Sequence, residues 1–82
     1  MSRISQKNFE RIAESVLRVL YDSFPIALST TQVAQELARD NEFIGRVLEF
    51  LEKKGYVQRK ARENRVDWLL TRGMKAQYDK LV

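Results

Sequence analysis

The spacing of apolar residues changes at Gly55, and this change constrains the fold more than any other feature of the sequence. Before Gly55, apolar residues recur at three- and four-residue steps, which is the period of amphipathic helices. After it, two strand-like runs flank the polar tract RKARENR, with Glu63 and Asn64 at its tip, which is typical of a β-hairpin. The chain is therefore predicted to be mainly α-helical with one small hairpin.

The first helix is predicted from about Ser5 to Tyr21, because its apolar residues fall on one face. These residues are Phe9, Ile12, Ala13, Val16, Leu17 and Leu20. Ser5 and Asn8 are candidate caps for its start, and Pro25 prevents its continuation. Residues 26–28, which follow the proline, are predicted to be extended.

Two further helices are predicted before Gly55. Ser29 is followed three residues later by Gln32, which is the spacing of a capping box at a helix start. This second helix is expected to end near Ala38. Asp40 can cap the third helix, and Gly55 is placed to end it. Two short helices joined by a short turn form a helix-turn-helix.

The predicted order is helix, strand, helix, helix, strand, strand, helix, in the α+β class. The helix-turn-helix covers about 29–54, the hairpin about 56–70, and a last helix about 72–81. Eighty-two residues are enough for one domain. They are too few for two, since two independent cores usually need about 100–150 residues each. The sequence is therefore predicted to be one winged-helix domain, residues 1–82.

The sequence contains neither Cys nor His. It therefore lacks a disulfide, a thiolate metal site, the commonest general base and the commonest metal ligand. We expect no enzyme activity, no catalytic residues, no metal and no cofactor. The amino terminus, MSRISQKNFERI, has no apolar run, and nowhere do about 18 apolar residues occur together. These features predict a cytoplasmic protein that does not bind a membrane.

Positive charge is concentrated in the last part of the chain. Residues 1–52 carry six Lys/Arg and eight Asp/Glu, net −2, whereas residues 53–82 carry nine and three, net +6, which together give +4. A basic stripe on a small domain is typical of a protein that binds a phosphate backbone. The alternative is an ordinary solvated surface rich in Lys, Arg and Glu.

The stretch LSTTQVAQELARDNEFIGRVLEFLEKKGYVQRKARENRVDWLLTRG, residues 28–73, resembles the winged helix-turn-helix of MarR- and ArsR-type transcriptional regulators of bacteria and archaea. The segment VLEFLEKKGYVQRK matches the end of the recognition helix, the glycine stop and the first wing strand. The segment WLLTRG matches the second wing strand and the start of the next helix. The resemblance implies binding of double-stranded DNA and a role in transcription regulation.

The resemblance also implies which residues contact DNA. The second helix would point its amino terminus at a phosphate, the third helix would enter the major groove, and the basic wing would contact the backbone or minor groove. Arg46 is the best candidate for reading guanine, and Asn41 for reading adenine; an ion pair of Arg46 with Glu42 or Glu49 is the alternative. The predicted DNA-binding residues are Thr30, Thr31, Gln32, Asn41, Glu42, Phe43, Arg46, Arg59, Lys60, Arg62 and Arg65.

A homodimer is expected, because two-fold pairing on a palindromic site would add to the limited contact of one small domain. The candidate interface residues, from the first and last helices, are Tyr21, Met74, Tyr78 and Leu81. Trp68 is expected to be a packing residue. Phe43 and Phe50 lie near one side of the third helix and either complete the core or meet a ligand.

A second hypothesis is a winged-helix protein interaction module in a replication, transcription or membrane-remodelling assembly. It is suggested by Glu42 and Glu49, which place negative charge on the outward face of the third helix. Phe43 and Phe50 would then contact the partner. Arg39, at a turn position where the family usually has an apolar residue, is a further departure from the pattern.

Overall fold

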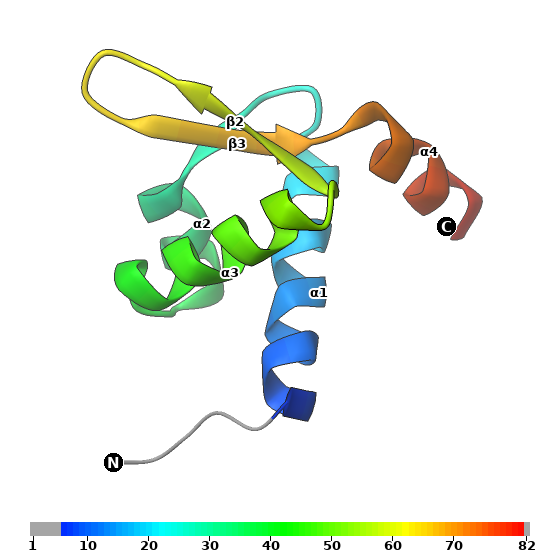
Figure 1. Ribbon diagram of the computed structural model, residues 1–82, viewed down its shortest axis with the longest axis horizontal. Helices are drawn as coiled ribbons and strands as arrows, with labels where there is room; N and C mark the ends of the chain where they lie inside the picture. The colour runs from blue at the N-terminus through cyan, green and yellow to red at the C-terminus, as the bar shows by residue number, and fades with distance from the viewer. Residues whose placement is uncertain (1–5, 82) are drawn as a thin grey trace.

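The computed structural model describes residues 6–81, and these form the predicted order of elements (Figure 1). The fold class, α+β with a winged helix-turn-helix, is confirmed. The predicted cap Ser5 and the ends of the predicted domain, residues 1–5 and 82, lie outside the described part. The elements are α1 (Gln6–Ser23), β1 (Leu28–Ser29), α2 (Thr30–Leu37), α3 (Asn41–Lys53), β2 (Val57–Ala61), β3 (Val66–Leu70) and α4 (Arg72–Leu81).

Local sequence signals set the ends of α2 and α3. The Ser29 hydroxyl accepts a hydrogen bond from the Gln32 amide at 3.1 Å, and the Gln32 side chain accepts one from the Ser29 amide at 2.9 Å. This is the predicted capping box. Asp40 caps α3 by accepting a bond from the backbone amide three residues later, at 3.1 Å. Gly55, with φ of 82°, follows α3 in a left-handed conformation that favours glycine.

The wing strands belong to a three-stranded antiparallel sheet in the order β1-β3-β2. Leu28 and Ser29 pair with Trp68 and Asp67, so the extended segment after the proline joins the wing. As the central strand, β3 is flanked on both sides. Asp67 and Leu69, which alternate with Trp68 and Leu70, are therefore buried as well, at 2% and 7% exposure.

The hydrophobic core lies between α1, α2, α3 and the sheet. Its members are fully or almost fully buried, and they are Ile12, Ala13, Val16, Leu17, Leu20, Val33, Ala34, Ile44, Val47, Leu48, Leu51, Val57, Trp68 and Leu70. In Figure 1 the wing extends on the same side as α2 and α3, and α4 lies on the other side. None of the helices in residues 6–81 is long and apolar enough to cross a membrane.

Candidate nucleic-acid interface

Thr30 joins the start of α2 to the wing. The indole Nε1 of Trp68, on β3, donates a hydrogen bond of 2.9 Å to the Thr30 hydroxyl oxygen. Trp68 is only 3% exposed, so it is a packing residue, as the sequence suggested. Because the Thr30 oxygen accepts this bond, its own hydroxyl proton remains available to donate elsewhere.

Thr31 joins the start of α2 to the start of α3. The side-chain amide of Asn41 donates a hydrogen bond of 2.9 Å to the Thr31 hydroxyl, and both residues are exposed. Gln32, the third residue proposed to meet a phosphate, is also exposed, and its side-chain oxygen completes the capping box. The starts of α2 and α3 and the second wing strand are therefore linked into one surface.

Arg46 is exposed on α3 and forms no ion pair with any residue between Gln6 and Leu81. Neither Glu42 nor Glu49 is paired with Arg46 among the described residues, and a contact of Arg46 with DNA stays a prediction. Glu42 lies in the first turn of α3, where a negative charge interacts favourably with the helix dipole. Its presence is thus explained by helix stability.

The aromatic residues of α3 pack against α1. The rings of Phe43 and Phe50 each meet the ring of Phe9 edge-on, with centroids 6.2 and 5.1 Å apart. Phe43 is half-buried, and Phe50 remains 36% exposed with the ammonium of Lys54 at 5.4 Å from its centroid. Both residues therefore extend the core at its edge, and a contact of Phe43 with DNA stays a prediction.

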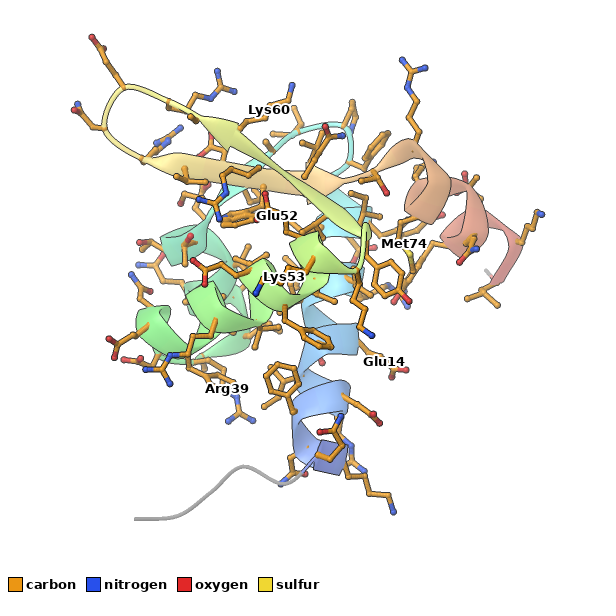
Figure 2. All side chains as sticks on the ribbon, in the orientation of Figure 1. Glu14, Arg39, Glu52, Lys53, Lys60 and Met74 are labelled. Carbon is orange, nitrogen blue, oxygen red and sulfur yellow. The ribbon has the colours of Figure 1, made fainter. Side chains whose placement is uncertain are left out.

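Arg59 is held against α3. Its Nε and Nη2 lie 3.3 and 3.1 Å from the two carboxylate oxygens of Glu52, with Glu49 at 4.0 Å. Its guanidinium also stacks over Trp68, 4.9 Å from the ring centroid. This bidentate pair fixes β2 to the end of α3 and neutralises the charge of Arg59. The next residue, Lys60, is exposed and points away from α3 (Figure 2).

Arg62 and Arg65 converge on the buried carboxylate of Asp67. The Nε of Arg62 donates to Oδ2 at 3.2 Å, and the Nε of Arg65 lies 3.0 Å from Oδ1. The second contact is ionic, because Oδ1 receives no well-aligned hydrogen bond from the described residues. Arg62, Arg65 and Asp67 together carry one net positive charge, which Glu63 at the tip offsets. The four predicted wing cations are therefore in three different environments.

Sequence reasoning missed the roles of Asp67 and Glu52. Asp67 carried one available signal, because a single charged residue inside the apolar run VDWLL is expected to have a partner when buried. Glu52 carried none, since its partner Arg59 lies seven residues away across the turn that follows α3. In the structure, the wing arginines form ion pairs with Glu52 and Asp67. The sequence analysis had counted these two carboxylates only toward the net charge.

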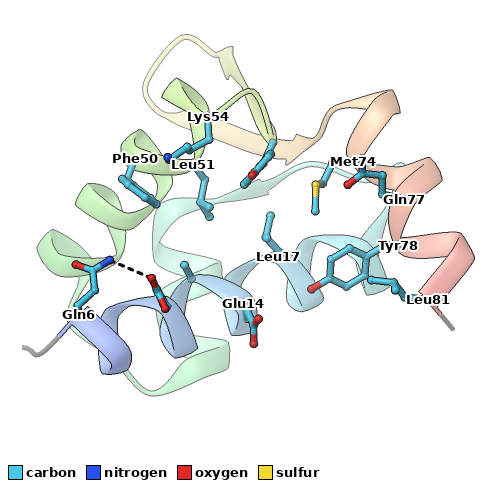
Figure 3. Close-up of a pocket in the computed structure, with 13 residues that line it drawn as sticks. Gln6, Glu14, Leu17, Phe50, Leu51, Lys54, Met74, Gln77, Tyr78 and Leu81 are labelled. Atoms are coloured by element: carbon cyan, nitrogen blue, oxygen red, sulfur yellow. Dashed lines mark hydrogen bonds between the residues drawn. The ribbon is translucent and has the colours of Figure 1, made fainter.

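The predicted dimer residues lie where α4 meets α1. The rings of Tyr21 and Tyr78 lie 5.2 Å apart, and the Tyr21 hydroxyl donates to Asp79 at 2.7 Å. Met74, Tyr78 and Leu81 line a groove of about 560 Å³ between α1, the end of α3 and α4 (Figure 3). Tyr21 is not among the residues that line this groove. Leu81 is 78% exposed, so it is the most accessible of the four.

The Tyr21 contact predicts a measurable titration. Its hydrogen bond to Asp79 raises the pKa of the Tyr21 phenol, and hydrogen bonds from Lys75 and Tyr21 lower the pKa of Asp79. We expect Asp79→Asn to bring the pKa of Tyr21 down towards its ordinary value of 10.0. Residue-resolved NMR titration of the tyrosine rings measures this change. An unchanged Tyr21 pKa in the variant would contradict the contact.

The contribution of the Tyr21–Asp79 contact to stability also depends on pH. Because the pKa of Asp79 is lowered in the folded chain, its contribution to stability is complete above its ordinary pKa of 3.8. It is lost as the pH falls through the lowered folded value. The contact between α4 and α1 should therefore weaken under strongly acidic conditions. Because the pKa of Tyr21 is raised, it should also weaken as the pH rises through that raised value.

No protein-family model and no curated protein matches the sequence. The fold itself is the winged helix, and solved structures of that fold superpose on most of the chain. A mutant of MepR from a multidrug-resistant clinical isolate of S. aureus has a TM-score of 0.77 at 20% identity, over 88% of this chain and 54% of its own. A MarR family transcriptional regulator from Silicibacter pomeroyi has a TM-score of 0.71 at 26% identity, over 84% of this chain and 48% of its own.

A third similar structure belongs to a different group. The Zalpha domain of PKZ from Carassius auratus, solved in complex with Z-DNA, has a TM-score of 0.68 at 17% identity, over 77% of this chain and 97% of its own. The chain therefore spans about half the length of each regulator and nearly the full length of the Zalpha domain. These structures establish the winged-helix fold.

Proposed function

We propose that the chain binds double-stranded DNA as a transcriptional regulator of bacteria or archaea, in the cytoplasm and as a homodimer. The observation that carries this proposal is the surface formed by α2, α3 and the wing, which hydrogen bonds of Thr30 and Thr31 hold together. On this surface Arg46 forms no ion pair with residues 6–81, and Arg62 and Arg65 are more than half exposed. The similar regulators support the same proposal.

Each part of the surface has a distinct role in the proposal. Arg46 and Asn41 on α3 contact base edges in the major groove. The hydroxyls of Thr30 and Thr31, with Gln32, contact a phosphate beside the start of α2. The wing contacts the backbone or the adjacent minor groove, with the exposed Lys60 as a further cation.

The dimer in this proposal uses the groove between α1 and α4. Leu81, Met74 and Tyr78 present apolar surface there, beside the partly exposed Phe50. Two copies related by a two-fold axis would then place their α3 helices on successive half-sites. Sedimentation equilibrium at micromolar concentration tests this part separately, and a monomer would overturn it.

The test of DNA binding is selection of bound sequences from a random duplex library at about 50 and 200 mM salt. We expect enriched sequences with half-site symmetry, and affinity for them that falls steeply with salt. Fluorescence anisotropy of the enriched duplex then gives the slope, at about −0.9 per phosphate neutralised. Absence of salt-sensitive binding to every duplex would overturn the proposal.

A second candidate is a protein interaction module, and one observation favours it. The outward face of α3 carries Glu42, Glu49 and Glu52, and two of these carboxylates approach Arg59. Together with the exposed edge of Phe50, these carboxylates would offer a protein partner both charged and aromatic contacts. Function that persists after loss of the positive charges of Arg62 and Arg65 would favour this candidate over DNA binding.

A further inference from the structure

Asp67 is a buried charge on the wing that the proposed DNA contacts do not use. It lies on the central strand β3 and is 2% exposed. A buried carboxylate is strongly destabilising unless it is paired, so its partners are required by the fold. Those partners are Arg62 and Arg65, which flank the tip of the hairpin.

Both arginines meet Asp67 through Nε, the inner nitrogen of the guanidinium. The distances are 3.2 Å for Arg62 and 3.0 Å for Arg65. A guanidinium has five N–H donors, and four of them are on the two terminal nitrogens. Those nitrogens form no hydrogen bond with the described residues, and the two side chains remain 55% and 64% exposed.

Arg62 and Arg65 both line a shallow hollow at the tip of the wing. Its lining consists of Arg62, Glu63, Asn64 and Arg65. A backbone hydrogen bond of 2.7 Å from the Arg62 amide to the Arg65 carbonyl closes this turn. This bond fixes the backbone positions of the two arginines relative to each other. The contacts with Asp67 restrain each guanidinium at its Nε atom.

We propose that Asp67 is a positioning residue, which holds Arg62 and Arg65 by their Nε atoms so that their terminal nitrogens form a preformed clamp for one phosphate group of the nucleic-acid backbone. The inference rests on the proposed function and adds the residue that organises the wing. Preorganised donors bind more tightly because less side-chain entropy is lost on binding.

Whether Asp67→Asn strengthens or weakens DNA binding distinguishes a positioning role of Asp67 from an effect of its charge alone. Asp67 is negative and lies beside the proposed phosphate, so by charge alone its neutralisation would strengthen DNA binding. If Asp67 positions the arginines, Asp67→Asn weakens binding although the wing gains positive charge. We expect affinity for the duplex to fall about fivefold, as when one charge-assisted hydrogen bond is impaired.

Glu63→Gln is the matched control. Glu63 lies at the same tip, is exposed and forms no ion pair with the described residues. Its neutralisation changes the net charge by the same amount without releasing an arginine. We expect this variant to bind about twofold more tightly than the wild-type chain, as charge alone predicts.

The measurement is fluorescence anisotropy of the selected duplex with the wild-type chain and both variants. NMR of the Nε–H groups of Arg62 and Arg65 in the free chain adds a readout that does not need DNA. The Arg62 proton, which is hydrogen-bonded to Asp67, should exchange slowly in the wild type and faster in Asp67→Asn, whereas the Arg65 proton, which is not, should change less. Trp68 fluorescence and circular dichroism confirm that each variant is folded.

A second variant keeps the test decisive if Asp67→Asn does not fold. Replacing Arg62 and Arg65 together by Lys keeps every charge, but an ammonium cannot hold the carboxylate with one nitrogen and offer a phosphate two others. We expect this double variant to bind the duplex about tenfold more weakly. Affinity equal to that of the wild-type chain would overturn the clamp.

The outcomes distinguish the two proposals. No duplex binding by the wild-type chain overturns the proposed function, and the clamp with it. Wild-type binding that Asp67→Asn leaves unchanged or strengthens, as Glu63→Gln does, overturns the clamp alone. Weaker binding by Asp67→Asn together with tighter binding by Glu63→Gln supports both.

Discussion

Replacing Leu48 by alanine should lower the free energy of unfolding by about 2–5 kcal/mol. Leu48 lies on the inward face of α3 and is completely buried. Alanine favours the helix, so the loss comes from removed apolar contacts and from the cavity that remains. A domain of 82 residues is expected to have about 4–12 kcal/mol of stability in total, so this one change removes a large part of it.

Urea denaturation followed by the fluorescence of Trp68 measures this effect. Ile26→Ala is the control, because it also truncates a branched aliphatic side chain, at a position that is 66% exposed and outside the proposed dimer interface. We expect the control to change stability by less than about 0.5 kcal/mol. Equal effects of the two substitutions would mean that the core does not depend on α3 as described.

The fold was predictable because its elements are specified by local signals. The Ser29 capping box, the Asp40 cap and the Gly55 stop each act within a few residues of the chain, and each forms as predicted. The period of the apolar residues likewise predicts which face of each helix is buried, because burial follows the geometry of the element itself.

The environment of the wing cations was not predictable, because it depends on contacts between elements. Arg59 pairs with Glu52 only after β2 folds back on the end of α3. Asp67 lies on the central strand between β1 and β2, and Arg62 and Arg65 meet it from the tip of the hairpin. Counting charges along the chain therefore treated paired and available cations as equal.

The triple variant Arg62→Gln, Arg65→Gln, Asp67→Asn should bind duplex DNA about 100-fold more weakly than the wild-type chain, since two charge-assisted phosphate contacts are lost. Removing all three charges together leaves no unpaired buried carboxylate, so the fold should be retained. If each arginine neutralises one phosphate, the slope of log affinity against log salt should become shallower by about 1.8. Anisotropy titrations at several salt concentrations measure both quantities.

The control for this prediction removes two positive charges from another part of the molecule. Arg72 and Lys80 lie on α4, which Figure 1 places on the side away from the wing tip. Because exposed charges are screened over about 10 Å at 0.1 M salt, replacing both by glutamine should leave the salt slope nearly unchanged. The triple variant lowers the net charge by one and the control lowers it by two, so if DNA sensed only the net charge of the domain, the control would change the slope more than the triple variant does. A shallower slope in the triple variant alone would place the phosphate contacts on the wing.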